Sequence, residues 1–196
     1  MMNDKQIYIL LTDTGTWFTK LIKCYTRKPY NHASIAFDEE LEKVYSFGRK
    51  KRRNPFIGGF IKEDIQTGLF KQASGAIYSF TITNEQWNKM NAYVQEIQQE
   101  QDNYRYNLLG LFGILLQIPI KRRNAFFCSQ FVATVLKKSN VIEYHKPPAL
   151  ITPHDLLSNE VFELVYKGKL KAYQKERLKS QVDQDFGEGR EDIILF

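Results

Sequence analysis

The sequence predicts a single domain of the α+β class. Most segments with a strand-like pattern precede residue 84, and most segments with helical spacing follow it. A chain of 196 residues fits one domain and is long enough to bury its own core. The composition, 43% hydrophobic and 26% charged, is that of a globular protein, and no internal repeat or linker marks off a second domain.

The N-terminal half supplies most of the expected strands. Residues 7–12 form a short apolar run typical of a buried strand, and residues 17–26 follow as a helical stretch. Residues 34–38 and 43–48 alternate apolar and small side chains on either side of an acidic turn, which predicts a hairpin. Residues 49–75 hold four glycines and few periodic runs, so we expect a long irregular loop there.

Helical patterns dominate the second half. After a strand over residues 75–83, Thr83 and Gln86 have the spacing of a capping box, which predicts the start of a helix. A second, apolar helix is expected over about 108–117 and a third over about 128–139.

The C-terminal region closes the domain. Thr152 is expected to be the N-cap of a short helix that has Pro153 at its first position. Residues 161–173 predict a hairpin that turns at a Lys-Gly pair. We therefore take residues 1–175 as the domain and residues 176–196 as a charged C-terminal tail.

Positive charge is concentrated in two places. The net charge is +6, with five cations at Arg49–Arg53 and three more at Lys121–Arg123. The basic loop at Arg49–Arg53 favours an anionic partner such as phospholipid headgroups, wall polymers or carboxylate-bearing peptides. Nucleic acid is not favoured, because no helix-turn-helix, zinc-ligand or aromatic RNA-binding pattern is present.

The apolar segments are short. Residues 107–120 are broken by two glycines and a glutamine and stopped by Pro119, whereas a membrane-spanning helix needs about 20 apolar residues. We expect a buried helix here, with contact to a membrane as the alternative. Only five clearly apolar residues stand in a row near the N-terminus, which predicts a cytoplasmic protein without a secretory signal. Two cysteines agree with a reducing compartment.

Cys128 is the main candidate for chemistry. It stands where the first turn of a helix is expected, and the unpaired N–H groups there lower the pKa of a thiol from its usual value of about 8.5. The same N–H groups can hold a developing oxyanion. The alternative is a cysteine that only packs in the core, as free cysteines often do.

A histidine partner would favour the nucleophile. His145 lies in a loop before prolines, and His154 lies at a helix start, where the dipole disfavours imidazolium. His32 lies at the mouth of a strand, so it can present an imidazole to a thiol on a helix, and we expect the two groups within about 3–4 Å. Cys24 has no basic partner and is expected to be buried and inert. No zinc-ligand spacing is present and no cofactor is indicated.

Two segments of the chain stand out together, "IYILLTDTGTWFTKLIKCYTRKPYNHASIAF" and "FFCSQFVATVL". Both resemble segments of the circularly permuted NlpC-type papain-like amidases of the YaeF/YiiX group. The histidine precedes the cysteine, which is the reverse of the ordinary NlpC order and the mark of the permuted group. The resemblance spans about residues 5–173. It implies a papain-like fold, in which a small antiparallel sheet or half-barrel packs against helices.

The resemblance also implies roles for three residues. Cys128 would be the nucleophile, and His32 would be the general base that later protonates the leaving group. The family orients its histidine with a third polar residue, often an acid, from the next strand. The position in register here is Ser46, a neutral residue, and Asp38 and Glu42 are the alternatives if the register differs.

The function implied by the resemblance is a thiol hydrolase. Its substrate would be an amide or peptide bond in a short peptide, including peptidoglycan-type stem peptides. Two alternatives stay open. One is a lipid-directed acyltransferase or thioesterase with the same dyad, in which residues 107–120 and the basic loop touch a membrane. The other is a catalytically inactive binding domain of the same fold, which the missing acid favours.

Overall fold

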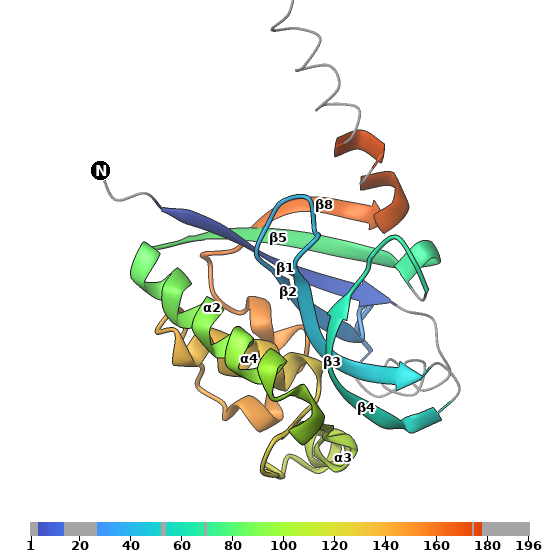
Figure 1. Ribbon diagram of the computed structural model, residues 1–196, viewed down its shortest axis with the longest axis vertical. Helices are drawn as coiled ribbons and strands as arrows, with labels where there is room; N and C mark the ends of the chain where they lie inside the picture. Colours follow the sequence, from blue (N-terminus) through green and yellow to red (C-terminus); the bar gives the residue numbers. More distant parts are fainter. Residues whose placement is uncertain (1–3, 14–26, 52–53, 69, 174, 178–196) are drawn as a thin grey trace, which may run out of the picture.

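The strand-forming segments assemble into one six-stranded sheet in the order β4-β3-β2-β1-β5-β8, with each neighbouring pair antiparallel (Figure 1). This computed structural model describes residues 4–13, 27–51, 54–68, 70–173 and 175–177. The strands are β1 Lys5–Asp13, β2 His32–Ala36, β3 Val44–Lys51, β4 Asn54–Glu63, β5 Ser74–Ile82 and β8 Glu163–Lys169. Together with the helices, this sheet confirms the predicted α+β class.

The helices lie on the expected periodic segments, but the prediction of a buried helix within 107–120 is wrong, because this helix exposes Leu109, Phe112 and Leu116. They are α2 Asn84–Gln99, α3 Leu108–Leu116 and α4 Cys128–Lys138. The predicted capping box at Thr83 is confirmed, because its hydroxyl accepts from the Gln86 N–H and the Gln86 side chain accepts from the Thr83 N–H. A small parallel pair, β6 Arg105–Tyr106 and β7 Ala125–Phe126, brings the ends of the α3 segment together.

The main sheet is covered on both faces. α2 and α4 lie side by side against one face, where they meet alternate residues of β1 such as Ile7 and Ile9 (Figure 1). The opposite face carries Tyr8 and Leu10 of β1, which pack against Leu170, the residue that follows β8. Because β1 is buried on both faces, its sequence is a continuous apolar run rather than an alternating one.

The predicted irregular loop over 49–75 is wrong for most of its length. β3 continues to Lys51, and β4 pairs with β3 along Asn54–Glu63. The glycines that suggested a loop allow close packing instead. A Cβ at Gly58 would lie 2.6 Å from the Gly48 carbonyl oxygen and 2.8 Å from the Tyr106 Cβ. Strand glycines of this kind mark a close approach of backbones rather than a break.

The predicted hairpin over 161–173 is also wrong. β8 runs as one strand along the edge of β5, and residues 170–173 are helical. Gly168 makes no turn: a Cβ there would lie 2.6 Å from the Tyr166 hydroxyl, which donates to the Lys169 carbonyl oxygen at 2.9 Å. The free edge of β5 thus provides the pairing that the sequence pattern had assigned to a local turn.

Several expectations concern residues beyond those described. The helix expected over 17–26, Cys24 within it, and the tail from residue 178 onward all lie outside the described residues. The part of the tail that is described, up to Arg177, is helical at residues 175–177, and Arg177 pairs with Glu39 at 2.7 Å.

Gly110→Ala is expected to destabilise the protein by about 1–3 kcal/mol, as overpacking does. A Cβ at Gly110 would collide with the buried Asn107 side chain and lie 3.1 Å from Phe127 Cδ1. Without this contact, alanine would stabilise a helix by about 1 kcal/mol. Urea unfolding measures the change. The control is Gly48→Ala, whose Cβ would meet chiefly the rotatable end of Ile61. Equal stability of Gly110→Ala and the wild type would contradict the packing argument.

Candidate active site

Cys128 is the first residue of α4 and is buried, with 4% of its surface exposed. Phe127 before it is extended and caps the helix, and its N–H donates to the Gln130 side-chain oxygen. The sulfur accepts hydrogen bonds from the backbone N–H groups of Ser129 and Ala33. The thiol is therefore held by a helix N-terminus on one side and by β2 on the other, as the sequence predicted for the helix.

His32 is the first residue of β2 and lies next to this thiol. A side-chain hydrogen bond joins the imidazole to Cys128. The other neighbour is Glu63, whose Oε1 lies 2.6 Å from His32 Nε2. Because Nε2 is occupied by the carboxylate, Nδ1 is the ring nitrogen available to the thiol. The structure thus brings the two predicted residues together and adds an acid on the far side of the ring.

Glu63 ends β4, and its side chain is only 1% exposed. Its second oxygen, Oε2, accepts from the Ser34 hydroxyl at 2.5 Å. A carboxylate taken out of water is costly unless both oxygens find partners, and His32 and Ser34 provide them. The pair is oriented so that the imidazole lies between a carboxylate and a thiol.

The pKa values of His32 and Cys128 both depart from their ordinary values. Burial alone lowers the pKa of His32, but the Glu63 carboxylate and the Cys128 sulfur outweigh it and raise this pKa to about 10. Burial raises the pKa of Cys128, but His32 and the two backbone N–H groups lower it by more, so the net change is downward. A thiolate–imidazolium pair therefore forms above the lowered thiol pKa. It is lost as pH rises through about 10.

Ser46 does not occupy the position that the resemblance implied. It is fully buried, and its hydroxyl donates to the Ala33 carbonyl oxygen at 2.7 Å. The alternative acids are elsewhere: Asp38 accepts from the N–H groups of Glu42 and Lys43 and closes the turn after β2, and Glu42 is exposed. The partner of the His32 ring comes from β4, one strand further than predicted, because residues 49–75 had been interpreted as a loop.

A signal for Glu63 was present in the sequence. The segment "FIGGFIKE" is rich in the aromatic and β-branched residues that strands favour, and an acid follows directly. The two central glycines hid it. The other histidines are both exposed: His145 as predicted, and His154 at the N-cap of the short 3₁₀ turn Asp155–Leu157.

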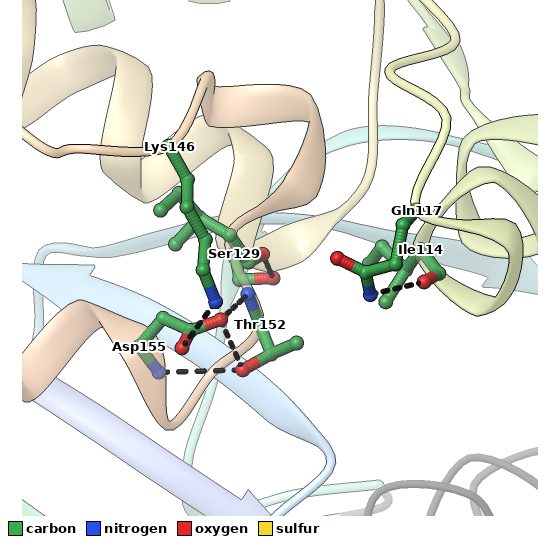
Figure 2. Close-up of polar contacts among 7 residues, drawn as sticks. Ile114, Gln117, Ser129, Lys146, Thr152 and Asp155 are labelled. Atoms are coloured by element: carbon green, nitrogen blue, oxygen red, sulfur yellow. Dashed lines mark hydrogen bonds and ion pairs between the residues drawn. The ribbon is translucent and has the colours of Figure 1, made fainter.

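The start of α4 is anchored from a second direction (Figure 2). The Ser129 hydroxyl donates to the Ile151 carbonyl oxygen at 2.7 Å. The next residue, Thr152, donates through its N–H and its hydroxyl to Asp155 Oδ2, and its hydroxyl accepts from the Asp155 N–H. Lys146 pairs with the same carboxylate at 3.2 Å. The predicted N-cap at Thr152 is wrong, because the 3₁₀ turn begins at Asp155 with His154 at its N-cap. Thr152 and Asp155 nevertheless bond each other in both directions, directly after the residue that accepts from Ser129.

A cavity of about 560 Å³ lies on the carboxylate side of the site. Glu63 and Lys62 are among its lining residues, and Cys128 and His32 are not. Of the three residues Cys128, His32 and Glu63, this cavity therefore reaches only Glu63, and it does not give access to the sulfur.

No protein-family model, curated protein or solved structure matches this chain. Within the described ranges, no three His, Cys, Asp or Glu side chains gather into a group that could hold a metal ion. Nor does any helix in the described part of the chain have the length and apolar character needed to cross a bilayer. The site is therefore interpreted from its own geometry.

Glu63→Gln is expected to move the alkylation of Cys128 to higher pH. The amide keeps an oxygen for Ser34 but removes the negative charge, so the pKa of His32 falls and that of Cys128 rises. The rate of iodoacetamide labelling at each pH, read on the Cys128 peptide by mass spectrometry, measures this shift, with the Cys24 peptide as an internal reference.

Ser46→Ala is the matched control, because it removes a buried hydroxyl on the neighbouring strand that does not contact the ring. Its labelling profile should overlay that of the wild type. A profile shifted by Ser46→Ala and unchanged by Glu63→Gln would assign the orienting role to the serine after all.

Proposed function

We propose that this protein is a cysteine hydrolase that cleaves an amide or peptide bond. The observation that carries the proposal is the row of three side chains, in which the partly buried His32 lies between the buried Cys128 thiol and the buried Glu63 carboxylate. Covalent acyl transfer requires a nucleophile, a base beside it and a group that orients the base, and Cys128, His32 and Glu63 are placed for these three roles.

The reaction starts from the thiolate–imidazolium pair. The Cys128 sulfur attacks the carbonyl carbon, a C–S bond forms, and the oxyanion is held by backbone N–H groups at the start of α4. His32 gives its proton to the amide nitrogen, the C–N bond breaks, and the amine leaves. Neutral His32 then takes a proton from water, whose oxygen attacks the thioester, and the acid leaves as the thiolate forms again.

Glu63 acts through His32 and not on the substrate. Its carboxylate fixes the ring on Nε2 and stabilises the imidazolium, which keeps the proton available for the leaving amine. It is a positioning residue in this scheme, with Ser34 holding its second oxygen.

The proposal includes a papain-like fold in permuted order. Its support is that the base lies on β2, the nucleophile begins α4, and β2 precedes α4 in the chain. A helix that starts with the cysteine and packs on the strand that starts with the histidine is the arrangement that the resemblance implied. Short peptides, including peptidoglycan-type stem peptides, are the proposed substrates.

The two alternatives differ in their support. The inactive binding domain was favoured by a missing acid, and Glu63 removes that argument. Lipid-directed acyl transfer would use the same three residues on an ester or thioester. It is favoured by the apolar side chains that α3 exposes, and it remains the second candidate.

Cys128→Ala is expected to abolish the hydrolysis of short peptide amides, and His32→Ala to reduce it close to that level. Incubation of the wild type with a panel of peptide amides and acyl thioesters, followed by mass spectrometry of the intact protein, should reveal an acyl adduct on Cys128. Turnover that survives Cys128→Ala would contradict the proposal. An adduct formed from lipid thioesters but from no peptide would favour the second candidate.

Glu63→Gln is expected to lower kcat/KM by about 10- to 100-fold, because a hydrogen bond to a charged group contributes about 1.5–3 kcal/mol. The loss should appear in kcat and not in KM, and the alkaline limb of the rate profile should move to lower pH. Ser46→Ala should stay within a few-fold of the wild type. A loss in KM alone would show that Glu63 binds substrate instead of orienting His32.

A further inference from the structure

α3 and the turn after it expose a group of large apolar side chains. In the described part of the chain, five of the eight exposed large apolar residues fall within this short segment. They are Leu109 (53% exposed), Phe112 (53%), Leu115 (40%), Leu116 (67%) and Ile118 (55%), and we name them the α3 surface. Single exposed apolar residues are common, but a contiguous group of them marks an interaction site.

The opposite side of α3 makes the contacts that the fold needs. Gly110, Gly113 and Ile114 are the buried residues of this helix. A Cβ at Gly113 would lie 2.5 Å from the Ile118 carbonyl oxygen, so the helix sits close against the following turn. The orientation of α3 is thus set by its inner side, and the side chains of the α3 surface are exposed to water.

The charges beside the α3 surface are all positive. Lys121, Arg122 and Arg123 follow directly and are exposed, and no acidic residue occurs between positions 107 and 124. Apolar side chains bordered by cations are typical of segments that lie in the interface of anionic membranes. A second copy of this chain is a poorer match, because a two-fold contact would bring the cations of both copies together.

The segment is suited to lie on a bilayer and not to cross it. α3 has nine residues, and at about 1.5 Å per residue it is far shorter than the hydrocarbon core of about 30 Å. Figure 1 shows α3 at the end of the molecule away from β8, where it is not covered by the sheet.

We propose that the α3 surface, together with Lys121–Arg123, docks this protein on bilayers that contain anionic phospholipid. The apolar side chains enter the headgroup region and the cations meet the lipid phosphates. The surface lies near the candidate active site, because the Asn107 side chain at the start of α3 donates to the Gln130 side-chain oxygen in α4. Docking does not depend on the proposed hydrolase activity, since it can be measured in Cys128→Ala.

Co-sedimentation with phosphatidylcholine vesicles, with and without phosphatidylglycerol, tests the proposal. The full chain should pellet with the anionic vesicles and not with the neutral ones. The double variant Phe112→Ser/Leu116→Ser should lose binding. The matched control is Leu164→Ser on β8, which is 54% exposed and should bind like the wild type. Circular dichroism of each variant verifies that the fold is retained.

The contribution of the cations is tested with the triple variant Lys121→Gln/Arg122→Gln/Arg123→Gln. Each cation near an anionic surface changes the binding constant by about fivefold, so the loss should be about 100-fold and should shrink as salt is added. Equal binding to neutral and anionic vesicles would overturn the proposal. Unchanged binding of either the Phe112→Ser/Leu116→Ser variant or the triple cation variant would overturn it too. So would an absence of vesicle binding together with a dimer, seen by sedimentation velocity, that Phe112→Ser/Leu116→Ser dissociates.

Discussion

The ion pair between His32 and Glu63 is the contact on which the rest of the site depends. It joins β2 to β4 across β3, which lies between them in the sheet, and the side chains of His32 and Glu63 are 13% and 1% exposed. Two residues of the intervening strand beside the pair, Ser46 and Gly48, are small. A Cβ at Gly48 of β3 would lie 3.9 Å from the His32 ring, and Ser46 turns its hydroxyl to the Ala33 carbonyl oxygen. β3 thus leaves space for the acid instead of supplying it.

The same pair explains why Cys128 differs from an ordinary buried cysteine. Burial by itself favours the neutral thiol, so a cysteine at the start of a helix often has only a packing role. Here the cation comes from a strand, and that cation is stabilised by a carboxylate behind it. The sulfur also accepts hydrogen bonds from backbone N–H groups of two different elements, α4 and β2. The lowered pKa of the Cys128 thiol therefore depends on how the sheet and the helix pack, and neither element produces it alone.

The sequence predicted what depends on local patterns and missed what depends on strand pairing. The helix at Asn84–Gln99 and the α4 helix have clear periodicity and recognisable starts, and the dyad residues lie at element ends that could be located. Glu63 could not be placed, because Gly58 and Gly59 have the composition of a loop although they permit close packing in β4. β8 was missed in the same way: its partner is β5, far away in the sequence, and a local Lys-Gly turn was the simpler interpretation.

Asn107 links the α3 segment to the helix that carries the thiol, and it indicates how the two act together. It is fully buried, accepts from the Gly110 N–H, and donates to the Ile120 carbonyl oxygen and the Gln130 side chain. Both of its donor hydrogens and its oxygen are therefore used. A movement of α3 relative to α4 would break buried hydrogen bonds that cost about 1–3 kcal/mol each when left unsatisfied. The contact between α3 and α4 thus behaves as a rigid joint. A surface bound to the outer side of α3 would hold the candidate active site at a fixed distance and orientation, and binding would not open or close the site.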